Sequence, residues 1–119
     1  MDYKVRESQR PFNGKAFNVR VDLLDGPAGT TSRVDIVEHP GAIALIPIDE
    51  QDRVWLVRQY RHPAGEDLLE LPAGTLDPGE SPEVCATRES REEIGMAPGE
   101  LILLGGTFLA PGYSTEYLH

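Results

Sequence analysis

The chain has 119 residues, enough for one folded domain with its own core but too few for two. Apolar residues make up 39% and charged residues 26%, a balance typical of a globular protein rather than of a fibrous or membrane-spanning one. Eleven Lys and Arg against twenty Asp and Glu give a formal net charge of −9, so we expect neither nucleic acid nor a membrane surface as a partner.

The N-terminal third reads as a polar arm followed by a hairpin. The first dozen residues are polar, and we expect them to form the arm. Residues 16–24 and 33–39 alternate apolar and polar positions, which is the period of a strand. The segment between them is rich in glycine and threonine and predicts a turn, so the two strands would pair as an antiparallel hairpin.

The middle of the chain predicts three further extended segments. Residues 42–48 are apolar and read as a buried strand, and residues 54–61 would be its partner, with Trp55 in the core. Residues 68–74 form a short extended piece that is closed by a proline and a glycine.

A single helix is predicted over residues 82–94. Ser81 is a good N-cap, Pro82 is tolerated in the first turn, and Gly95 supplies the left-handed residue that commonly follows a helix. Residues 100–110 then return to a strand. Strands, one central helix and strands again predict an α+β fold with a mixed sheet.

We expect residues 1–119 to form a single domain, with an arm and strands over 1–40 and a catalytic core over 41–119. Residues 114–119 start a new alternation and stop, so we also expect a C-terminal segment to follow in a longer protein. The lone Cys85 cannot form an internal disulfide and reads as a small apolar helix residue, and the charged N-terminus lacks the apolar run of a signal peptide. These features predict a cytoplasmic protein.

The stretch "RESREEIG" crowds three glutamates onto one side of the predicted helix. Glu89, Glu92 and Glu93 lie at spacings i, i+3 and i+4, where like charges cost roughly 0.2–0.5 kcal/mol per pair. They also lie near the helix C-terminus, where the macrodipole disfavours carboxylates. Breaks of local rules tend to mark functional sites. A solvated charged face with Arg88 and Arg91 as partners remains the alternative.

Clustered carboxylates without His or Cys favour hard divalent cations such as Mg²⁺ or Mn²⁺. The preceding loop offers backbone carbonyls, and its glycines, Gly74 and Gly79, allow a ligand to approach closely. Arg58 and Arg61 would end a strand near the same cleft. A metal and arginines facing a carboxylate cluster are typical of phosphoryl chemistry.

The same residues carry a resemblance to the Nudix hydrolase family. From Gly74 the chain runs five residues to Glu80 and seven more to Arg88, and then reads "RESREEIGM". This resembles the 23-residue Nudix box, and eight positions match: Gly74, Glu80, Arg88, Glu89, Glu92, Glu93, Gly95 and Met96. Ser90 departs from the usual aliphatic residue, and its hydroxyl would weaken helix packing or bond back to the carbonyl of Ala86.

The segments around the box resemble the ADP-ribose pyrophosphatase branch of that family. They are "HPGAIALIPID", "VRQYRHP", "LLELPAG" and "APGYSTE", the last with a proline fifteen residues after Met96. The resemblance implies an α/β/α sandwich with a mixed sheet, the box forming a loop-helix-loop.

The resemblance also implies roles for individual residues. Arg88 would hold a neighbouring glutamate in place, and Glu80 would brace the loop. The implied catalytic residues are Arg88, Glu89, Glu92 and Glu93. The implied metal ligands are Glu89, Glu92, Glu93 and the carbonyl of Ala73, with Glu70 either a contact of the metal site or an outward-pointing side chain. The implied substrate contacts are Arg61, Arg58, Gly74, Pro111, Gly112 and Glu116.

The implied activity is Mg²⁺-dependent hydrolysis of ADP-ribose to AMP and ribose 5-phosphate, with Mn²⁺ able to substitute. Nucleotide sugars and other nucleoside diphosphate derivatives are the rival substrates, and a non-catalytic ADP-ribose-binding module is the rival class. A homodimer is implied, with the N-terminal arm and strands helping to build the partner's adenosine site. The general base of this branch would lie on a loop beyond His119, unless a glutamate of the box takes that role.

Overall fold

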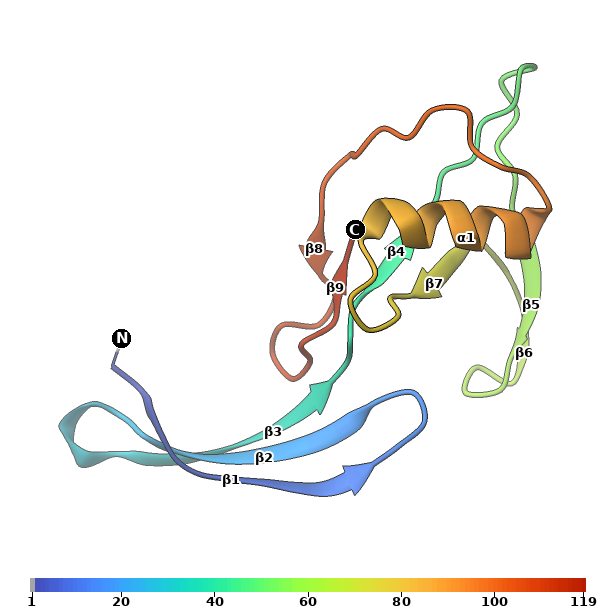
Figure 1. Ribbon diagram of the computed structural model, residues 1–119. Helices are drawn as coiled ribbons and strands as arrows, with labels where there is room; N and C mark the ends of the chain where they lie inside the picture. Colours follow the sequence, from blue (N-terminus) through green and yellow to red (C-terminus); the bar gives the residue numbers. More distant parts are fainter. Residues whose placement is uncertain (1) are drawn as a thin grey trace. The chain divides into compact units, whose positions relative to one another are not determined.

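The structure is a computed structural model that describes residues 2–119 (Figure 1). It divides into two compact units: one holds the residues up to Gly41 together with Thr107–Tyr117, and the other holds Ala42–Gly106 with Leu118–His119. The first of these units therefore combines two segments that lie far apart in the sequence. No helix within residues 2–119 is long and apolar enough to cross a membrane.

The first unit is built on three antiparallel strands in chain order, which run side by side in Figure 1. They are β1 (Lys4–Asn13), β2 (Asn18–Asp25) and β3 (Thr31–Glu38). β2 and β3 pair without a register shift, and the short 3-10 turn η1 (Pro27–Gly29) joins them. The predicted antiparallel hairpin is therefore confirmed.

The prediction of an N-terminal arm was wrong, because these residues form strand β1. β1 pairs with β2 along its length, with two register shifts. Its polar side chains find partners on the other two strands of the sheet: Arg6 pairs with Asp25 of β2, and Nε of Arg10 lies 2.8 Å from Oε2 of Glu38 at the end of β3. Every residue of β1 is exposed. Polar composition does not exclude a strand whose two faces are both open to solvent.

The later segment of the first unit contributes β8 (Thr107–Phe108) and a bridge to β3. Ser114 bridges Val37 in parallel, and the Phe108 and Tyr117 rings meet edge to face with centroids 4.9 Å apart. The strand predicted for residues 100–110 is thus confined to two residues. A double glycine with Gly105 at a φ of +143° precedes them and interrupts extended pairing.

The second unit packs one helix on a small mixed sheet. β4 (Ala42–Ala44) pairs antiparallel with β7 (Ala73–Thr75) and in parallel with Leu118 of β9 (Tyr117–Leu118). Helix α1 (Pro82–Ile94) lies against β4 and β7 (Figure 1). The buried core consists of Ile43, Cys85 and Ala86, with Leu45 and Leu76 packed against it. The predicted α+β class with a mixed sheet is confirmed.

The predicted pairing of residues 42–48 with 54–61 was wrong except for one bridge between Ile48 and Val54. β4 ends at Ala44, and its partners in the sheet are β7 and β9 rather than residues 54–61. β5 (Val57–Arg61) pairs instead with β6 (Glu66–Glu70) as a separate hairpin. Trp55 is not in the core: it is 40% exposed, and its indole N–H donates to Asp49 at 3.1 Å.

Helix α1 begins and ends where the sequence predicts. The Ser81 hydroxyl accepts a hydrogen bond from the Val84 N–H, and Gly95 adopts the left-handed conformation with φ of 69°. The predicted bond from Ser90 to Ala86 was wrong. The buried Ser90 hydroxyl donates to the carbonyl of Met96 at 2.6 Å, which ties the residue after the cap back to the helix.

Candidate active site: a carboxylate cluster on helix α1

Glu89 lies in a position that is open only because residue 74 is a glycine. Gly74 sits in the middle of β7, and a Cβ placed on it would overlap the Glu89 carboxyl group. Glu89 is 8% exposed, and burial raises the pKa of its carboxyl group above its usual value, although the hydrogen bond from Arg88 opposes this rise. A buried carboxylate with raised pKa is a group that a cation would stabilise.

Arg88 connects the glutamates of the cluster to the loop before the helix. Its guanidinium donates two hydrogen bonds of 2.8 Å to Glu80 and one of 2.8 Å to Oε1 of Glu89. It also reaches Oε2 of Glu92 at 3.3 Å and the carbonyl of Thr75 at 3.3 Å. The bonds to Glu80 are the main reason why the pKa of Arg88 rises above its usual range. The positive charge of Arg88 therefore balances part of the negative charge of the carboxylates around it.

Glu93 has a different partner, Gln59 of strand β5. The Gln59 amide nitrogen lies 3.1 Å from Oε2 and 3.5 Å from Oε1 of Glu93. Gln59 is not among the site residues predicted from the sequence. A signal was present, because Gln59 lies two residues before Arg61 and so shares its face of a strand.

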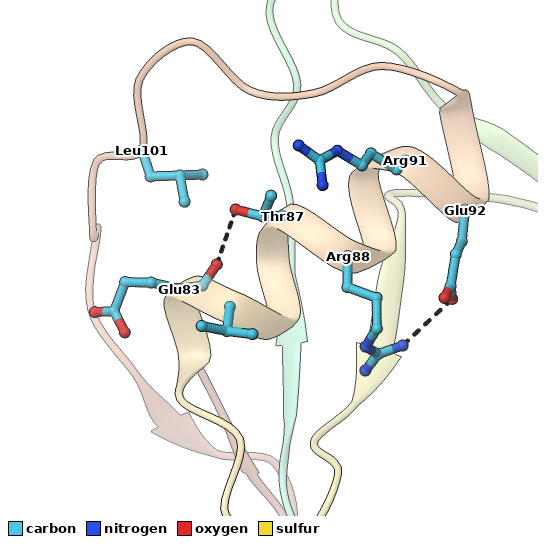
Figure 2. Close-up of a pocket in the computed structure, with 7 residues that line it drawn as sticks. Glu83, Thr87, Arg88, Arg91, Glu92 and Leu101 are labelled. Carbon is cyan, nitrogen blue, oxygen red and sulfur yellow. Dashed lines mark hydrogen bonds and ion pairs between the residues drawn. The ribbon is translucent and has the colours of Figure 1, made fainter.

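Glu92 is the most exposed member of the cluster, with its side chain 59% accessible. Figure 2 shows Arg88 extending from α1 toward Glu92, and Arg91, Thr87 and Leu101 bordering a hollow beside the same helix. The full lining is Glu83, Val84, Thr87, Arg88, Arg91, Glu92 and Leu101. Neither Glu89 nor Glu93 lines this hollow. The hollow is therefore not the carboxylate cluster itself, although Arg88 and Glu92 belong to both.

The β5–β6 hairpin separates the two arginines that the sequence grouped together. Arg58 and Arg61 are three residues apart on β5, so their side chains leave opposite faces of the strand. Arg61 donates to both oxygens of Glu70 at distances from 2.7 to 3.0 Å. These hydrogen bonds are the main cause of a raised pKa at Arg61 and a lowered pKa at Glu70. Glu70 is therefore paired with an arginine rather than pointing outward alone.

The remaining predicted substrate contacts belong to the first unit. Pro111 and Gly112 lie in the turn between β8 and Ser114, where the Ser114 N–H donates to the Ala110 carbonyl at 2.8 Å. The Glu116 carboxylate lies 4.0 Å from Nδ1 of His39. Within their unit, these residues form a turn that pairs with the end of β3.

The donor set fits a hard divalent cation in its chemistry. Glu89, Glu92, Glu93 and the Ala73 carbonyl offer oxygen atoms alone, which is the preference of Mg²⁺ and Mn²⁺. They are not assembled as a finished cage: across residues 2–119, no three His, Cys, Asp or Glu side chains converge in a metal-binding arrangement. Arg88 and Gln59 hold the carboxylates instead. A cation at this site would therefore compete with Arg88 for Glu89.

Comparison with known proteins places this geometry in a family. Residues 37–119 match the NUDIX domain. The chain belongs to the Nudix family. The matched range includes helix α1, its two caps and Gly74.

Two curated relatives and one solved structure match nearly the whole chain. The methanol dehydrogenase activator of Bacillus methanolicus is 37% identical over 116 residues, covering 98% of this chain and 63% of the relative. The ADP-ribose pyrophosphatase of Bacillus subtilis is 33% identical over 119 residues, covering 100% and 64%. A crystal structure of an ADP compounds hydrolase superposes with a TM-score of 0.85 at 24% identity, covering 99% and 64%. This Nudix chain therefore spans less than two thirds of the length of these proteins, and the structural match confirms its fold.

Proposed function

We propose that this Nudix chain is the catalytic part of a divalent-metal-dependent pyrophosphohydrolase whose substrate is ADP-ribose. Water would add to one phosphorus and the bridging P–O bond would break, giving AMP and ribose 5-phosphate. The similarity to an ADP-ribose pyrophosphatase supports the choice of substrate.

The observation that carries the proposal is the group of glutamates at the end of α1 that two different elements hold in place. Glu89 is buried beneath Gly74 and tied to Arg88, while Glu93 is bound from β5. A protein that only needs a stable helix gains nothing from like charges at this spacing. Holding them there makes sense if a cation joins them.

The chain's own residues divide the work. Glu89, Glu93 and the Ala73 carbonyl would hold the cation, and Glu92, which is exposed, would add a bridging or water-mediated contact. Arg88 orients Glu89 and, through Glu80, keeps the loop closed. Arg61 would exchange Glu70 for a phosphate oxygen of the substrate, because guanidinium binds carboxylate and phosphate by the same paired hydrogen bonds.

The cation itself would neutralise phosphate charge and activate water. Divalent metal ions are general to the family, and we assign Mg²⁺, with Mn²⁺ as a substitute, because both prefer oxygen ligands. A glutamate of the box is the first candidate for the general base, with Glu92, the most exposed member of the cluster, the first to test.

We also propose a cytoplasmic homodimer. The lone Cys85 supports a reducing compartment. Strand β1 ends its three-stranded sheet with every residue exposed, and such an edge is suited to pairing with a second chain. Sedimentation of the purified protein at several concentrations tests the dimer.

Two alternatives use the same fold differently. Nucleotide sugars share the pyrophosphate of ADP-ribose and differ from it in the groups attached to that pyrophosphate, so a site that binds metal and pyrophosphate could accept them. The 37% identity to a methanol dehydrogenase activator favours a second candidate function, activation of a methanol dehydrogenase. A pure ADP-ribose binder would have no use for the intact Glu89, Glu92 and Glu93.

The test is a turnover panel with Mg²⁺ or Mn²⁺ and ADP-ribose, nucleotide sugars and other nucleoside diphosphate derivatives, with products separated by chromatography. We expect ADP-ribose to give the highest kcat/KM, and AMP and ribose 5-phosphate in equal amounts. Tight binding of ADP-ribose without product would identify a binding module. An increase in the activity of a methanol dehydrogenase when this protein is added would support the second candidate function.

A further inference from the structure

Gln59 is the neutral side chain that binds Glu93 from another element. Its amide nitrogen spans the two carboxylate oxygens at 3.1 and 3.5 Å, and both side chains are half-buried. We propose that Gln59 is a positioning residue, which orients the Glu93 carboxylate toward the divalent cation without competing with it. This inference rests on the proposed function, since it concerns the same site.

Glu93 needs such a partner because its surroundings disfavour a fixed carboxylate. It lies in the last turn of α1, where the helix dipole is negative, and Glu89 lies four residues before it. Arg88 is already engaged by Glu80, Glu89 and Glu92. Arg61 raises the local positive charge but makes its hydrogen bonds to Glu70.

An amide suits this position better than a charged group does. Arg88 binds Glu89 as a cation and must be displaced, at least in part, when a metal binds the same oxygen. The Gln59 amide carries no net charge and leaves the remaining lone pairs of Glu93 free for a metal. Partners of metal ligands act in this way in many proteins, and their loss typically weakens metal binding roughly 10–100-fold.

The strand fixes the direction from which Gln59 acts. Gln59 pairs with Leu68 in the middle of the β5–β6 hairpin, and its chain neighbours also have register partners on β6, so its position along the hairpin is fixed. Alternation along β5 places Gln59 and Arg61 on one face and Arg58 and Tyr60 on the other. Among the described side chains of this strand, Gln59 is thus the amide aimed at α1.

The experiment measures metal binding directly, by calorimetric titration of Mg²⁺ and Mn²⁺ into the protein without nucleotide. Gln59→Met keeps the size of the side chain and removes its donor. We expect its metal dissociation constant to rise about tenfold or more. The matched control is Gln9→Met, because Gln9 makes the same kind of bond, 2.5 Å to Glu7, on strand β1. The control should bind metal as the wild type does.

A double-mutant cycle separates positioning from a general structural role. Gln59→Met should have almost no further effect on metal affinity in a Glu93→Gln background, whereas independent losses would add. If Gln59→Met does not fold, Gln59→Asn replaces it, since its amide is one methylene too short to reach Glu93 and the same loss is expected.

Failure of this inference can be distinguished from failure of the proposed function. Unchanged metal affinity in the folded Gln59 variant overturns the inference, even if the protein hydrolyses ADP-ribose. Weakened affinity that depends on Glu93 supports it, even if ADP-ribose proves to be the wrong substrate. A wild-type chain that binds neither cation overturns the inference and the metal assignment together.

Discussion

Arg88 and Glu80 form a two-bond ion pair, with Nε and Nη2 each 2.8 Å from a carboxylate oxygen, and this pair closes the loop that leads into helix α1. Glu80 also accepts a hydrogen bond of 3.1 Å from the Asp77 N–H. The helix that carries the glutamates is thereby fixed to the strand–loop segment beneath them. Substitution of either Arg88 or Glu80 should therefore destabilise both the loop and the start of the helix.

Stability should depend on pH through Glu80. The Arg88 hydrogen bonds hold the pKa of the Glu80 carboxyl group at about 2, against an ordinary value of 4.5. A lowered pKa in the folded state adds stability that is present above the unfolded value and is lost as the pH falls toward 2. We therefore expect Glu80→Gln to melt below the wild type at neutral pH, with the difference shrinking below pH 4.5. Melting curves of both proteins across this range measure it, and a constant difference would contradict the assignment.

Gly74→Ala should damage the site while a matched glycine tolerates the change. The new Cβ would meet the Glu89 carboxyl group, whereas a Cβ at Gly99 meets nothing within 4 Å. We expect Gly74→Ala to lower the melting temperature and to weaken metal binding, because Glu89 must move. Gly99→Ala should change neither. Equal behaviour of the two variants would mean that Glu89 adjusts freely.

Glu93→Gln should lower turnover about 10²-fold, because the site loses one anionic ligand for the cation while the shape of the side chain is kept. Substrate KM should change much less. Glu83→Gln is the control, since Glu83 lies on the same helix, in its first turn, and is exposed. Steady-state kinetics at saturating Mg²⁺ compare the three proteins, and near-normal turnover in Glu93→Gln would remove Glu93 from the site.

A divalent cation should stabilise the fold by binding linkage. Burial raises the pKa of Glu89, so the ionised carboxylate costs stability at neutral pH and the cost falls as the pH drops toward 4.5. We expect millimolar Mg²⁺ or Mn²⁺ to raise the melting temperature of the wild type. In chelator, Glu89→Gln should melt above the wild type at pH 7, because its carbonyl can still accept from Arg88. A melting temperature that does not change when metal is added would favour the alternative in which the glutamates form a solvated charged face.

Much of the site could be predicted because its residues lie close together in the sequence. Helix α1 begins after Ser81 and ends before Gly95, as local capping rules require, and the spacing of the box fixes which glutamates share a turn. The same local logic gave the β2–β3 hairpin, whose two strands alternate and flank a turn.

The errors fell where pairing between distant segments decides the outcome. The polar β1 forms a strand because it pairs with β2, and β5 pairs with β6 instead of with the apolar segment that follows β4. Gln59 was missed for the same reason. Alternation places Gln59 on the same face of β5 as Arg61, but its importance comes from Glu93, 34 residues away, and the alternation does not indicate that partner.

The alternation of β5 makes the active site sensitive to a slip of one residue. If β5 moved by a single position against β6, its hydrogen-bond ladder and strand content would survive, but every side chain would change face. Arg58 or Tyr60 would then replace Gln59 beside α1, bringing a cation or a phenol to Glu93. Such a misfolded protein would look native by circular dichroism and yet bind metal poorly. Correct register in this hairpin is therefore a requirement for the Gln59–Glu93 contact that secondary-structure content alone does not report.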